Sequence, residues 1–343
     1  MSSPAVKSLS LPGGARLSLA RPVICGILNV TPDSFSDGGR YLDPDAAVRH
    51  GRGMIAEGAA LIDIGAETTR PGSAPVDAHE QWRRLEPVIA QLTHPMGKGG
   101  MSPFPSSPLP SPGLSPRNPG VAQEGGMSPS PFVVSIDTQS AAVAEQALAA
   151  GASIINDVSA GRDPRMFEVA ARRGAAIILM HMRGEPATMQ QAPSYRDVVA
   201  EVRDFLLQRA SAAEAAGVAR ESIVLDPGLG FGKTAQHNLA LLAQLGAFTA
   251  TGYPVLLGAS RKSFLAALPG ALPGPNPGAE QVEPGARLGG TCATTALGVA
   301  AGVALFRVHD VAANRQAADL AWAVAGIRRG NTDSDCLTGR SLG

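Results

Sequence analysis

Short apolar runs recur eight times along the chain, and each is followed by a polar or glycine-rich loop and a longer amphipathic segment. Continuous apolar runs of this kind are typical of strands buried on both faces of a parallel sheet. They predict strands over residues 23–30, 61–67, 132–138, 153–159, 176–182, 223–226, 254–260 and 304–309. The sixth leads through Asp226 into the glycine-rich loop DPGLGFGKT, which suits a ligand site or, equally, a strand-to-helix turn whose aspartate caps backbone amides.

The amphipathic segments between these runs predict helices that return the chain to the next strand. They are expected over residues 43–57, 77–92, 139–150, from 163, 195–216, 236–245, 288–302 and 310–327. Asp43-Pro44 and Asp163-Pro164 each predict a helix start, and Asp310 predicts the cap of the last helix. Eight alternating strands and helices predict an α/β fold, the (β/α)8 TIM barrel. An open doubly wound sheet is the alternative, but it seldom runs to eight strict repeats.

Four segments fall outside the repeat. Residues 1–22 are expected to form a frayed N-terminal arm with a short hairpin around Pro12-Gly13-Gly14, and residues 329–343 a C-terminal tail, so that the barrel spans 23–328. Residues 95–131 are rich in Pro, Ser, Gly and Met and lack periodicity. Because such a composition buries too little apolar surface to offset its ordering entropy, it predicts a disordered insertion. A shorter Pro- and Gly-rich insertion is expected at 268–284.

Composition narrows the class of protein further. Lys plus Arg equals Asp plus Glu, 29 each in 343 residues, so no global charge attracts nucleic acid or an anionic membrane. The cysteines, Cys25, Cys292 and Cys336, show no pairing pattern, which favours a reducing compartment and argues against a zinc site. No apolar run reaches the roughly 18 residues of a membrane span, and no secretory signal is evident. We therefore expect a cytoplasmic protein.

Polar side chains stand at the end of every predicted strand, whereas the strand bodies are largely apolar. They are Asn29, Glu67 to Arg70, Asp137, Asn156, Asp157, His181, Asp226, Ser260 to Lys262, Arg307 and His309. In a TIM barrel, the carboxyl ends of all strands meet on one face, which holds the active site. Each residue alone has an ordinary structural explanation, such as helix capping by Asp157 or Asp310, but the set predicts a functional site.

The chemistry of this set divides into two halves. One half suits a flat, nitrogen-rich heterocycle, since a carboxylate can pair with two N–H groups of an amidine-like edge; its members are Asp137, Asn156, Asp226 and Lys262. The other half seeks anions such as phosphate or diphosphate, and its members are Thr69, Arg70, Arg307 and His309. Asn29 is expected to be an oxygen ligand for a Mg²⁺ ion shared with the phosphates. Together the halves predict a heterocycle that carries a diphosphate leaving group.

Eight motifs, in order along the eight predicted strands, resemble the dihydropteroate synthase family of folate biosynthesis. They are GILNVTPDSFSDGG (26–39), IDIGAETTRPGS (62–73), SIDT (135–138), IINDVS (154–159), LMHMRG (179–184), DPGLGFGKT (226–234), GASRKSF (258–264) and RVHD (307–310). The resemblance covers residues 22–328 apart from the two insertions. It implies a transferase that joins (7,8-dihydropterin-6-yl)methyl diphosphate to 4-aminobenzoate, giving 7,8-dihydropteroate and diphosphate.

The resemblance also implies roles for individual residues. Pterin binding is expected from Asp137, Asn156, Asp226 and Lys262 with Met180 nearby, and diphosphate binding from Thr69, Arg70, Arg307 and His309, with Val308 also in the substrate site. The 4-aminobenzoate is expected against Phe231, Ser260 and Lys262, under a mobile loop bearing Asp33 and Phe35. The implied catalytic residues are Asn29, Asp33, Lys262, Arg307 and His309, with Asn29 on Mg²⁺. A homodimer through the last helices is implied as well.

Three other functions compete with this interpretation. A pterin-binding methyltransferase barrel would share the ring pocket, but it has no use for the Arg70, Arg307 and His309 anion group or for Asn29. A non-catalytic pterin-binding homologue predicts losses among Asn29, Arg70, Lys262 and His309, yet all are present. A sugar-phosphate barrel enzyme would normally carry a Lys or Glu base within a strand.

Overall fold

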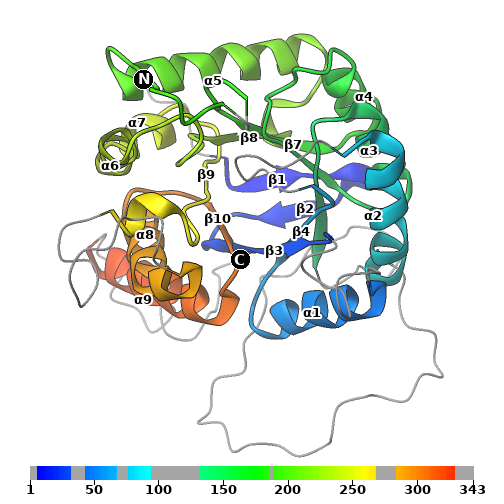
Figure 1. The fold of residues 1–343 in the computed structure, drawn as a ribbon, viewed down its shortest axis with the longest axis horizontal. Coiled ribbons are helices and arrows are strands. Elements are labelled where there is room, and N and C mark those ends of the chain that lie inside the picture. Colours follow the sequence, from blue (N-terminus) through cyan, green and yellow to red (C-terminus); the bar gives the residue numbers. More distant parts are fainter. Residues whose placement is uncertain are drawn as a thin grey trace, which may run out of the picture.

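Eight parallel strands form a barrel surrounded by helices in the computed structural model, which describes residues 6–31, 43–67, 76–93, 132–185, 188–267 and 283–328 (Figure 1). The strands are β3 (Val23–Asn29), β4 (Leu61–Gly65), β5 (Val133–Asp137), β6 (Ile154–Asp157), β7 (Ala176–Met180), β8 (Ile223–Asp226), β9 (Leu256–Leu257) and β10 (Leu305–Val308). Neighbours pair in chain order, and β10 returns to pair with β3. A single bridge between Leu225 and Val255 joins β8 to β9 and closes the barrel. The predicted TIM barrel is confirmed.

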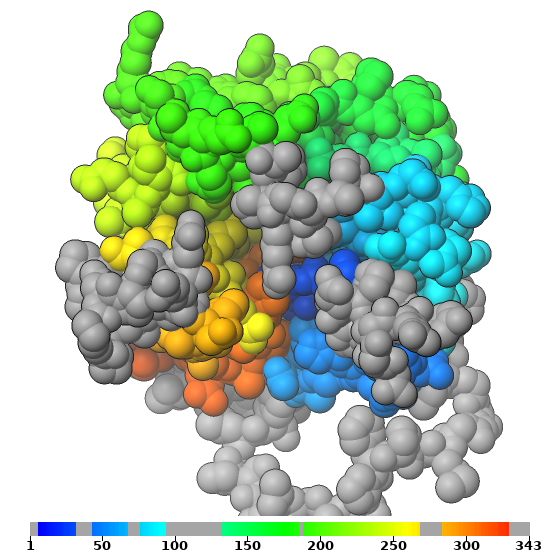
Figure 2. All heavy atoms as spheres, viewed as in Figure 1, coloured from blue at the N-terminus to red at the C-terminus, as the bar shows by residue number. Residues whose placement is uncertain are grey.

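The helices follow one another around the rim in chain order (Figure 1), and the sequence colours run around the molecule in the same order in the space-filling view (Figure 2). They are α1 (Pro44–Ala56), α2 (Ala78–Thr93), α3 (Ala141–Ala149), α4 (Met166–Arg173), α5 (Val198–Ala215), α6 (Ala235–Ala243), α7 (Gly246–Thr249), α8 (Leu288–Ala300) and α9 (Val311–Arg328). Asp43 caps α1 as predicted, because its carboxylate accepts from the backbone N–H groups of Asp45 and Ala46. Within the described ranges, no helix is long and apolar enough to cross a membrane.

Helix α4 starts later than predicted, and Asp310 stands at the start of α9 as predicted while its carboxylate is engaged elsewhere. Helix α4 begins at Met166, and the Asp163 carboxylate instead accepts from the backbone of Arg165 and of Ala141, the first residue of α3. The carboxylate of Asp310, before α9, pairs with the Arg261 guanidinium at 2.5 Å. In both places a residue distant in the sequence binds the carboxylate that the local pattern assigned to a helix start.

Two predicted elements also differ in extent. The helix expected over 236–245 is α6, which ends at Ala243, and a separate short helix, α7, follows it. The strand expected over 254–260 shrinks to β9, although the Pro254 carbonyl still accepts from the Leu225 N–H and Val255 forms the closing bridge. Residues 94–131, 268–282 and 329–343 lie outside the described residues, so the predicted insertions and tail stay predictions.

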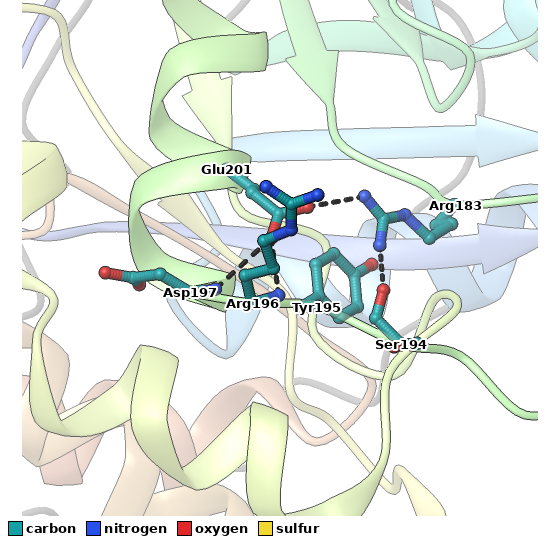
Figure 3. Close-up of a pocket in the computed structure, with 6 residues that line it drawn as sticks. All are labelled: Arg183, Ser194, Tyr195, Arg196, Asp197 and Glu201. Carbon is teal, nitrogen blue, oxygen red and sulfur yellow. Dashed lines mark hydrogen bonds and ion pairs between the residues drawn. The ribbon is translucent and has the colours of Figure 1, made fainter.

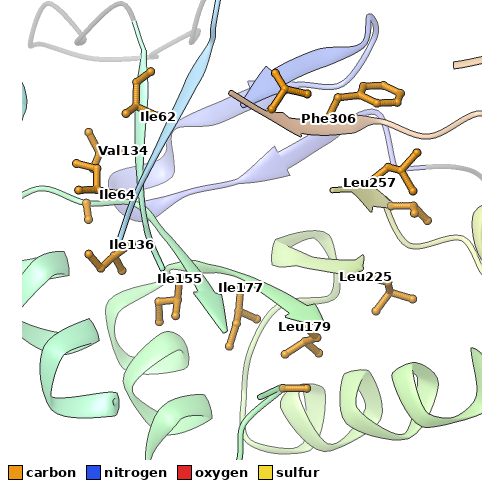
Figure 4. Packing of buried hydrophobic residues seen from close by; sticks show 14 of the residues in the cluster. Ile62, Ile64, Val134, Ile136, Ile155, Ile177, Leu179, Leu225, Leu257 and Phe306 are labelled. Atoms are coloured by element: carbon orange, nitrogen blue, oxygen red, sulfur yellow. The ribbon is translucent and has the colours of Figure 1, made fainter. Parts of the chain in front are cut away.

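The strands send alternate side chains to opposite faces, and this alternation separates the packed core from the site. Side chains on the outer face, such as Ile62 and Ile64 of β4 and Phe306 of β10, pack against the helices in one continuous cluster (Figure 4). On β4 the residue between the two isoleucines is Asp63, which therefore points into the barrel. The outer faces thus hold the helices, and the inner faces are left to line the interior.

Residues 6–22, the described part of the N-terminal segment, are not a frayed arm. Strands β1 (Ser8–Ser10) and β2 (Arg16–Ser18) form an antiparallel hairpin around a turn at Pro12–Gly14, which confirms the hairpin but not the fraying. Its leucines, Leu9, Leu11 and Leu17, are buried among residues that begin the barrel strands. The hairpin therefore covers the amino-terminal end of the barrel, and only the opposite end is available to the predicted site.

Candidate active site

A network of charged side chains crosses the carboxyl-terminal end of the barrel. Arg307 of β10 donates from Nε to Asp63 of β4 at 2.6 Å and from Nη2 to Asp137 of β5 at 2.7 Å. Asn156 of β6 donates from Nδ2 to Asp63 at 2.9 Å, on the same carboxylate oxygen that Arg307 uses. The four strands are not all neighbours, so these bonds span the interior and hold four inward-facing side chains in one arrangement.

Burial and charge set the protonation of this network. Burial raises the pKa of Asp137 to about 7, while Arg307 opposes that shift and Asp63 adds to it. Burial acts to lower the pKa of Arg307, but Asp63 and Asp137 outweigh it and raise that pKa, so the guanidinium stays charged. Two carboxylates share one guanidinium, so Asp137 is poised to gain or lose a proton near neutral pH.

Asp226 and Lys262 act on each other electrostatically beside the network. Burial raises the pKa of Asp226, against the effect of Lys262 and of the Gly228 N–H, which donates to the carboxylate at 2.7 Å. Burial lowers the pKa of Lys262 to about 8, with Asp226 opposing the shift. The Lys262 Nζ lies 4.4 Å from the centre of the Phe231 ring and donates to the Leu229 carbonyl. An ammonium over an aromatic face is a cation–π contact.

The glycine-rich loop between β8 and α6 is built around a buried lysine. Lys233 is 3% exposed and donates to the carbonyls of Gly228 at 2.9 Å and Phe231 at 3.0 Å. Its Nζ also lies 3.0 Å from Nδ1 of His181. Burial, and to a lesser extent Lys233, lowers the pKa of His181 to about 3, so the imidazole is neutral and accepts the bond. A Cβ on Gly228 would lie 2.0 Å from the His181 carbonyl oxygen. This loop therefore needs glycine to sit directly on the end of β7.

The segment after β9 positions the remaining polar groups of the mouth. The Ser260 hydroxyl lies 3.0 Å from Nδ1 of His309 and accepts from the His309 N–H at 3.1 Å. Arg261 between Ser260 and Lys262 has a φ of 59°, an uncommon value for a residue with a side chain. The ion pair with Asp310 holds it there. The strained residue turns Ser260 toward His309 and Lys262 toward Phe231.

Asn29 is the only predicted metal ligand. It is the last residue of β3, pairs in register with Gly65 at the end of β4, and is partly exposed at the mouth. Across the described ranges, no group of three or more His, Cys, Asp or Glu residues is arranged to hold a metal ion. Mg²⁺ commonly binds through one or two protein oxygens plus substrate phosphates, and a single amide oxygen at the mouth fits that use.

The structure brings together most of the predicted site residues. Asp137, Asn156, Asp226, Lys262, Arg307, Ser260 and His309 lie at the barrel mouth in the contacts above, and Met180 packs in a small apolar cluster with Phe231. Val308 is the exception, because its side chain belongs to the outer cluster and any substrate contact would have to use its main chain. Asp33, Phe35, Thr69 and Arg70 lie outside the described residues.

Two residues of the site were missed from the sequence. Asp63 is 1% exposed and joins Arg307 to Asn156, although it lies within a strand body and not at a strand end. A lone charge inside an apolar strand was the available signal, because such a charge is stable only when it is paired. Lys233 was visible in the glycine-rich loop, but nothing local distinguishes a buried structural lysine from a solvated one.

Comparison with known proteins agrees with this geometry. A family model described as "Pterin binding enzyme" matches residues 25–99 and 124–309. A dihydropteroate synthase of Mycobacterium leprae is 45% identical over 314 residues, covering 90% of this chain and 96% of that protein.

Solved structures show the same likeness. A Xanthomonas albilineans dihydropteroate synthase with 4-aminobenzoic acid is 38% identical, with a TM-score of 0.74 over 93% of this chain and 98% of that one. The same enzyme in complex with 7,8-dihydropteroate is 37% identical, with a TM-score of 0.70 over 92% of this chain and 98% of that one. The chain therefore belongs to the dihydropteroate synthase family, a family of pterin-binding transferases.

Proposed function

We propose that the barrel mouth divides the dihydropteroate synthase reaction among three groups of residues. In this reaction the amine of 4-aminobenzoate attacks the methylene carbon of (7,8-dihydropterin-6-yl)methyl diphosphate. The bond from that carbon to the diphosphate oxygen breaks, its electron pair leaves with diphosphate, and the new C–N nitrogen loses one proton. The product is 7,8-dihydropteroate.

The first group holds the pterin ring. Asp226 is a buried carboxylate whose Oδ1 already accepts from Gly228, and it suits the paired N–H groups of the pterin edge. Because the Asn156 Nδ2 donates to Asp63, the Asn156 amide oxygen is turned away from that carboxylate and acts as an acceptor for a ring N–H. Asp137, at the end of the adjacent strand, is assigned the role of stabilising positive charge on the methylene carbon.

The second group holds the leaving diphosphate. Arg307 and His309 lie two residues apart at the end of β10 and face the same side, and Thr69 and Arg70 are assigned here by the family resemblance. Asn29 would hold a Mg²⁺ ion together with the phosphate oxygens. When bound, the ion would neutralise charge that develops on the departing diphosphate.

The third group receives 4-aminobenzoate. Lys262 carries positive charge at neutral pH and lies over Phe231, so one ligand can place its carboxylate near the ammonium and its ring against the phenyl group. Ser260 is two residues before Lys262, and its hydroxyl lies 3.0 Å from Nδ1 of His309. A neutral aromatic amine needs little activation beyond such positioning. Asp33 and Phe35 are assigned to this group by the family resemblance alone.

The proposal rests mainly on the hydrogen-bonded network at the barrel mouth, next to Asp226 and Lys262. The members of this network are Asp63, Asp137, Asn156 and Arg307. The test is to incubate the protein with dihydropterin-methyl diphosphate and Mg²⁺, with and without 4-aminobenzoate, and to measure diphosphate and dihydropteroate. We expect dihydropteroate only when both substrates are present. Pterin binding without product would indicate a non-catalytic homologue instead, and demethylation of methyltetrahydrofolate would indicate a methyltransferase.

We further propose that the protein is a homodimer through α8 and α9. Leu320, Val324 and Ile327 are 69%, 42% and 66% exposed and follow a four- and three-residue spacing along one face of α9, and Leu297 of α8 is 57% exposed. An apolar stripe of this kind marks an interaction surface. Light scattering after size exclusion should give twice the chain mass, and Leu320→Lys should give one chain mass. A wild-type monomer would contradict the proposal.

A further inference from the structure

The connection between β7 and α5 packs against the glycine-rich loop at two points. The Tyr195 hydroxyl donates to the Gly232 carbonyl at 2.8 Å, and the Gln190 amide donates to the Gly230 carbonyl at 2.5 Å. The loop is thus bonded from outside by this connection and from inside by Lys233. Gly232 adjoins Phe231, whose ring lies under the Lys262 ammonium.

Tyr195 is itself held in place by an ion-paired arginine (Figure 3). The Arg183 guanidinium lies 3.9 Å from the centre of the Tyr195 ring and pairs with Glu201 at 2.7 Å. The other Glu201 oxygen accepts from the backbone N–H of Arg196 at 2.7 Å. Burial raises the pKa of Tyr195 to about 12, so the phenol keeps the proton that it donates. A stacked, bonded and protonated phenol is a rigid support for the loop.

Two residues of the ring half, Asp137 and Asn156, make no described contact with this support. Asp137 and Asn156 are held by Arg307 and Asp63 on the strands, and no contact described between these residues involves Tyr195. Phe231, by contrast, sits in the loop beside the Gly232 carbonyl that Tyr195 bonds. A displacement of the loop would therefore move Phe231 while the strand-borne pterin residues stay in place.

We infer that Tyr195 is a positioning residue for the second substrate, because its hydrogen bond to Gly232 fixes Phe231 beneath Lys262. The inference rests on the proposed function, in which Phe231 and Lys262 receive 4-aminobenzoate. Loss of the hydroxyl leaves the Gly232 carbonyl without this donor and frees the loop to shift, but Lys233 still holds it from inside. The expected effect is therefore a weaker grip on 4-aminobenzoate, not a loss of activity.

The chain contains a matched control at Tyr253. The Arg220 guanidinium lies 3.8 Å from the centre of its ring, and its hydroxyl donates to Glu214 at 2.8 Å. Burial raises the pKa of Tyr253 to about 12, as for Tyr195. Tyr253 precedes β9 at the amino-terminal end of the barrel and makes no described contact with the glycine-rich loop. Removing its hydroxyl tests the same chemistry away from the site.

The experiment compares Tyr195→Phe, Tyr253→Phe and wild type by steady-state kinetics for each substrate in turn. We expect Tyr195→Phe to raise the KM for 4-aminobenzoate by about fivefold, as for loss of one hydrogen bond, and to leave the KM for the pterin diphosphate within about twofold. Tyr253→Phe should change neither KM. Equal rises in both KM values for Tyr195→Phe, or no rise in either, would overturn the inference.

A second measurement judges the inference without turnover. The Gly230 N–H donates to Asn238 at 2.7 Å and the Phe231 N–H to Gly228 at 3.2 Å, so both amides should resist hydrogen exchange in the wild type. Tyr195→Phe should speed their exchange, and Tyr253→Phe should not. Unchanged exchange at these amides would overturn the inference, whereas a wild type that makes no dihydropteroate would count against the proposed function.

Discussion

Replacing Asp63 by asparagine removes a buried charge while keeping an acceptor in place. Both bonds, from Arg307 Nε at 2.6 Å and Asn156 Nδ2 at 2.9 Å, fall on Oδ2, and Oδ1 is buried without a hydrogen-bond partner. An amide can put its oxygen at the Oδ2 position and so retain both bonds without the charge. In Asp63→Ala both bonds are lost, and the Arg307 guanidinium is left with Asp137 alone.

The two variants should therefore differ in stability. Bonds to a charged group contribute about 1.5–3 kcal/mol and neutral ones about 0.5–1.5 kcal/mol. In Asp63→Asn the Asn156 bond becomes neutral and the Arg307 bond keeps only the charge of the guanidinium, so the variant should cost roughly 2 kcal/mol. Breaking a buried ion pair costs about 3–5 kcal/mol, and Asp137 should keep Asp63→Ala near the lower end of that range. Arg307 is 21% exposed and Asp63 1%, so solvent screens little of this energy. Asp319→Asn, which removes half of a surface pair with Arg315, is the control and should cost under about 1 kcal/mol.

The cost of Asp63→Asn should also depend on pH. The folded pKa of Asp137 is raised to about 7, so its contribution to stability is present at low pH and is lost as the pH rises through that value. Asp63 is one cause of the rise, and Asp63→Asn should therefore lower the Asp137 pKa and reduce this loss. The deficit of the variant relative to wild type should shrink between about pH 5.5 and about pH 8.5.

Urea denaturation at both pH values, followed by tryptophan fluorescence, measures these quantities. Equal deficits for Asp63→Asn and Asp63→Ala would show that the two bonds on Oδ2 do not carry the stabilisation. A deficit that grows with pH would show that Asp63 does not raise the pKa of Asp137.

Three further substitutions test the rest of the site. Gly228→Ala should destabilise the protein by about 3 kcal/mol in urea denaturation, against about 1 kcal/mol for the control Gly174→Ala. Gly174 has a similar φ of 61° but nothing within 4 Å of the place that a Cβ would take. Equal costs for the two variants would rule out the clash with the His181 carbonyl. Lys233→Met should cost about 3 kcal/mol, because the carbonyls to which Nζ donates lose their donor. A cost below about 1 kcal/mol by the same denaturation assay would show that these carbonyls find other donors. Because the pKa of Lys262 is about 8, the ammonium is lost as the pH rises, and kcat/KM for 4-aminobenzoate should fall about tenfold from pH 7 to pH 9. If the Lys262→Ala variant shows the same fall, the titration belongs to another group.

Much of this protein can be predicted from local patterns. The apolar runs and their spacing predict the barrel, because parallel strands buried on both faces and amphipathic return helices leave few other ways to hide their apolar surface. The strand-end residues could be assigned to one face without knowing any contact, since all strands of the barrel point the same way. Alternation along β4 likewise implies that Asp63 and its neighbours Ile62 and Ile64 face opposite sides.

Only the tertiary structure decides which inward side chains meet. Arg307 was assigned to the anion-binding half from its strand-end position, but nothing local predicts that it also bonds Asp63 and Asp137, which lie 244 and 170 residues away in the chain. The N-terminal leucines carry no local sign that they cover the bottom of the barrel, and Asp310 shows none that it will bind Arg261 instead of a helix end. The reason is physical: period and propensity act over a few residues and determine which way a side chain faces. The partner it finds depends on the register and closure of all eight strands.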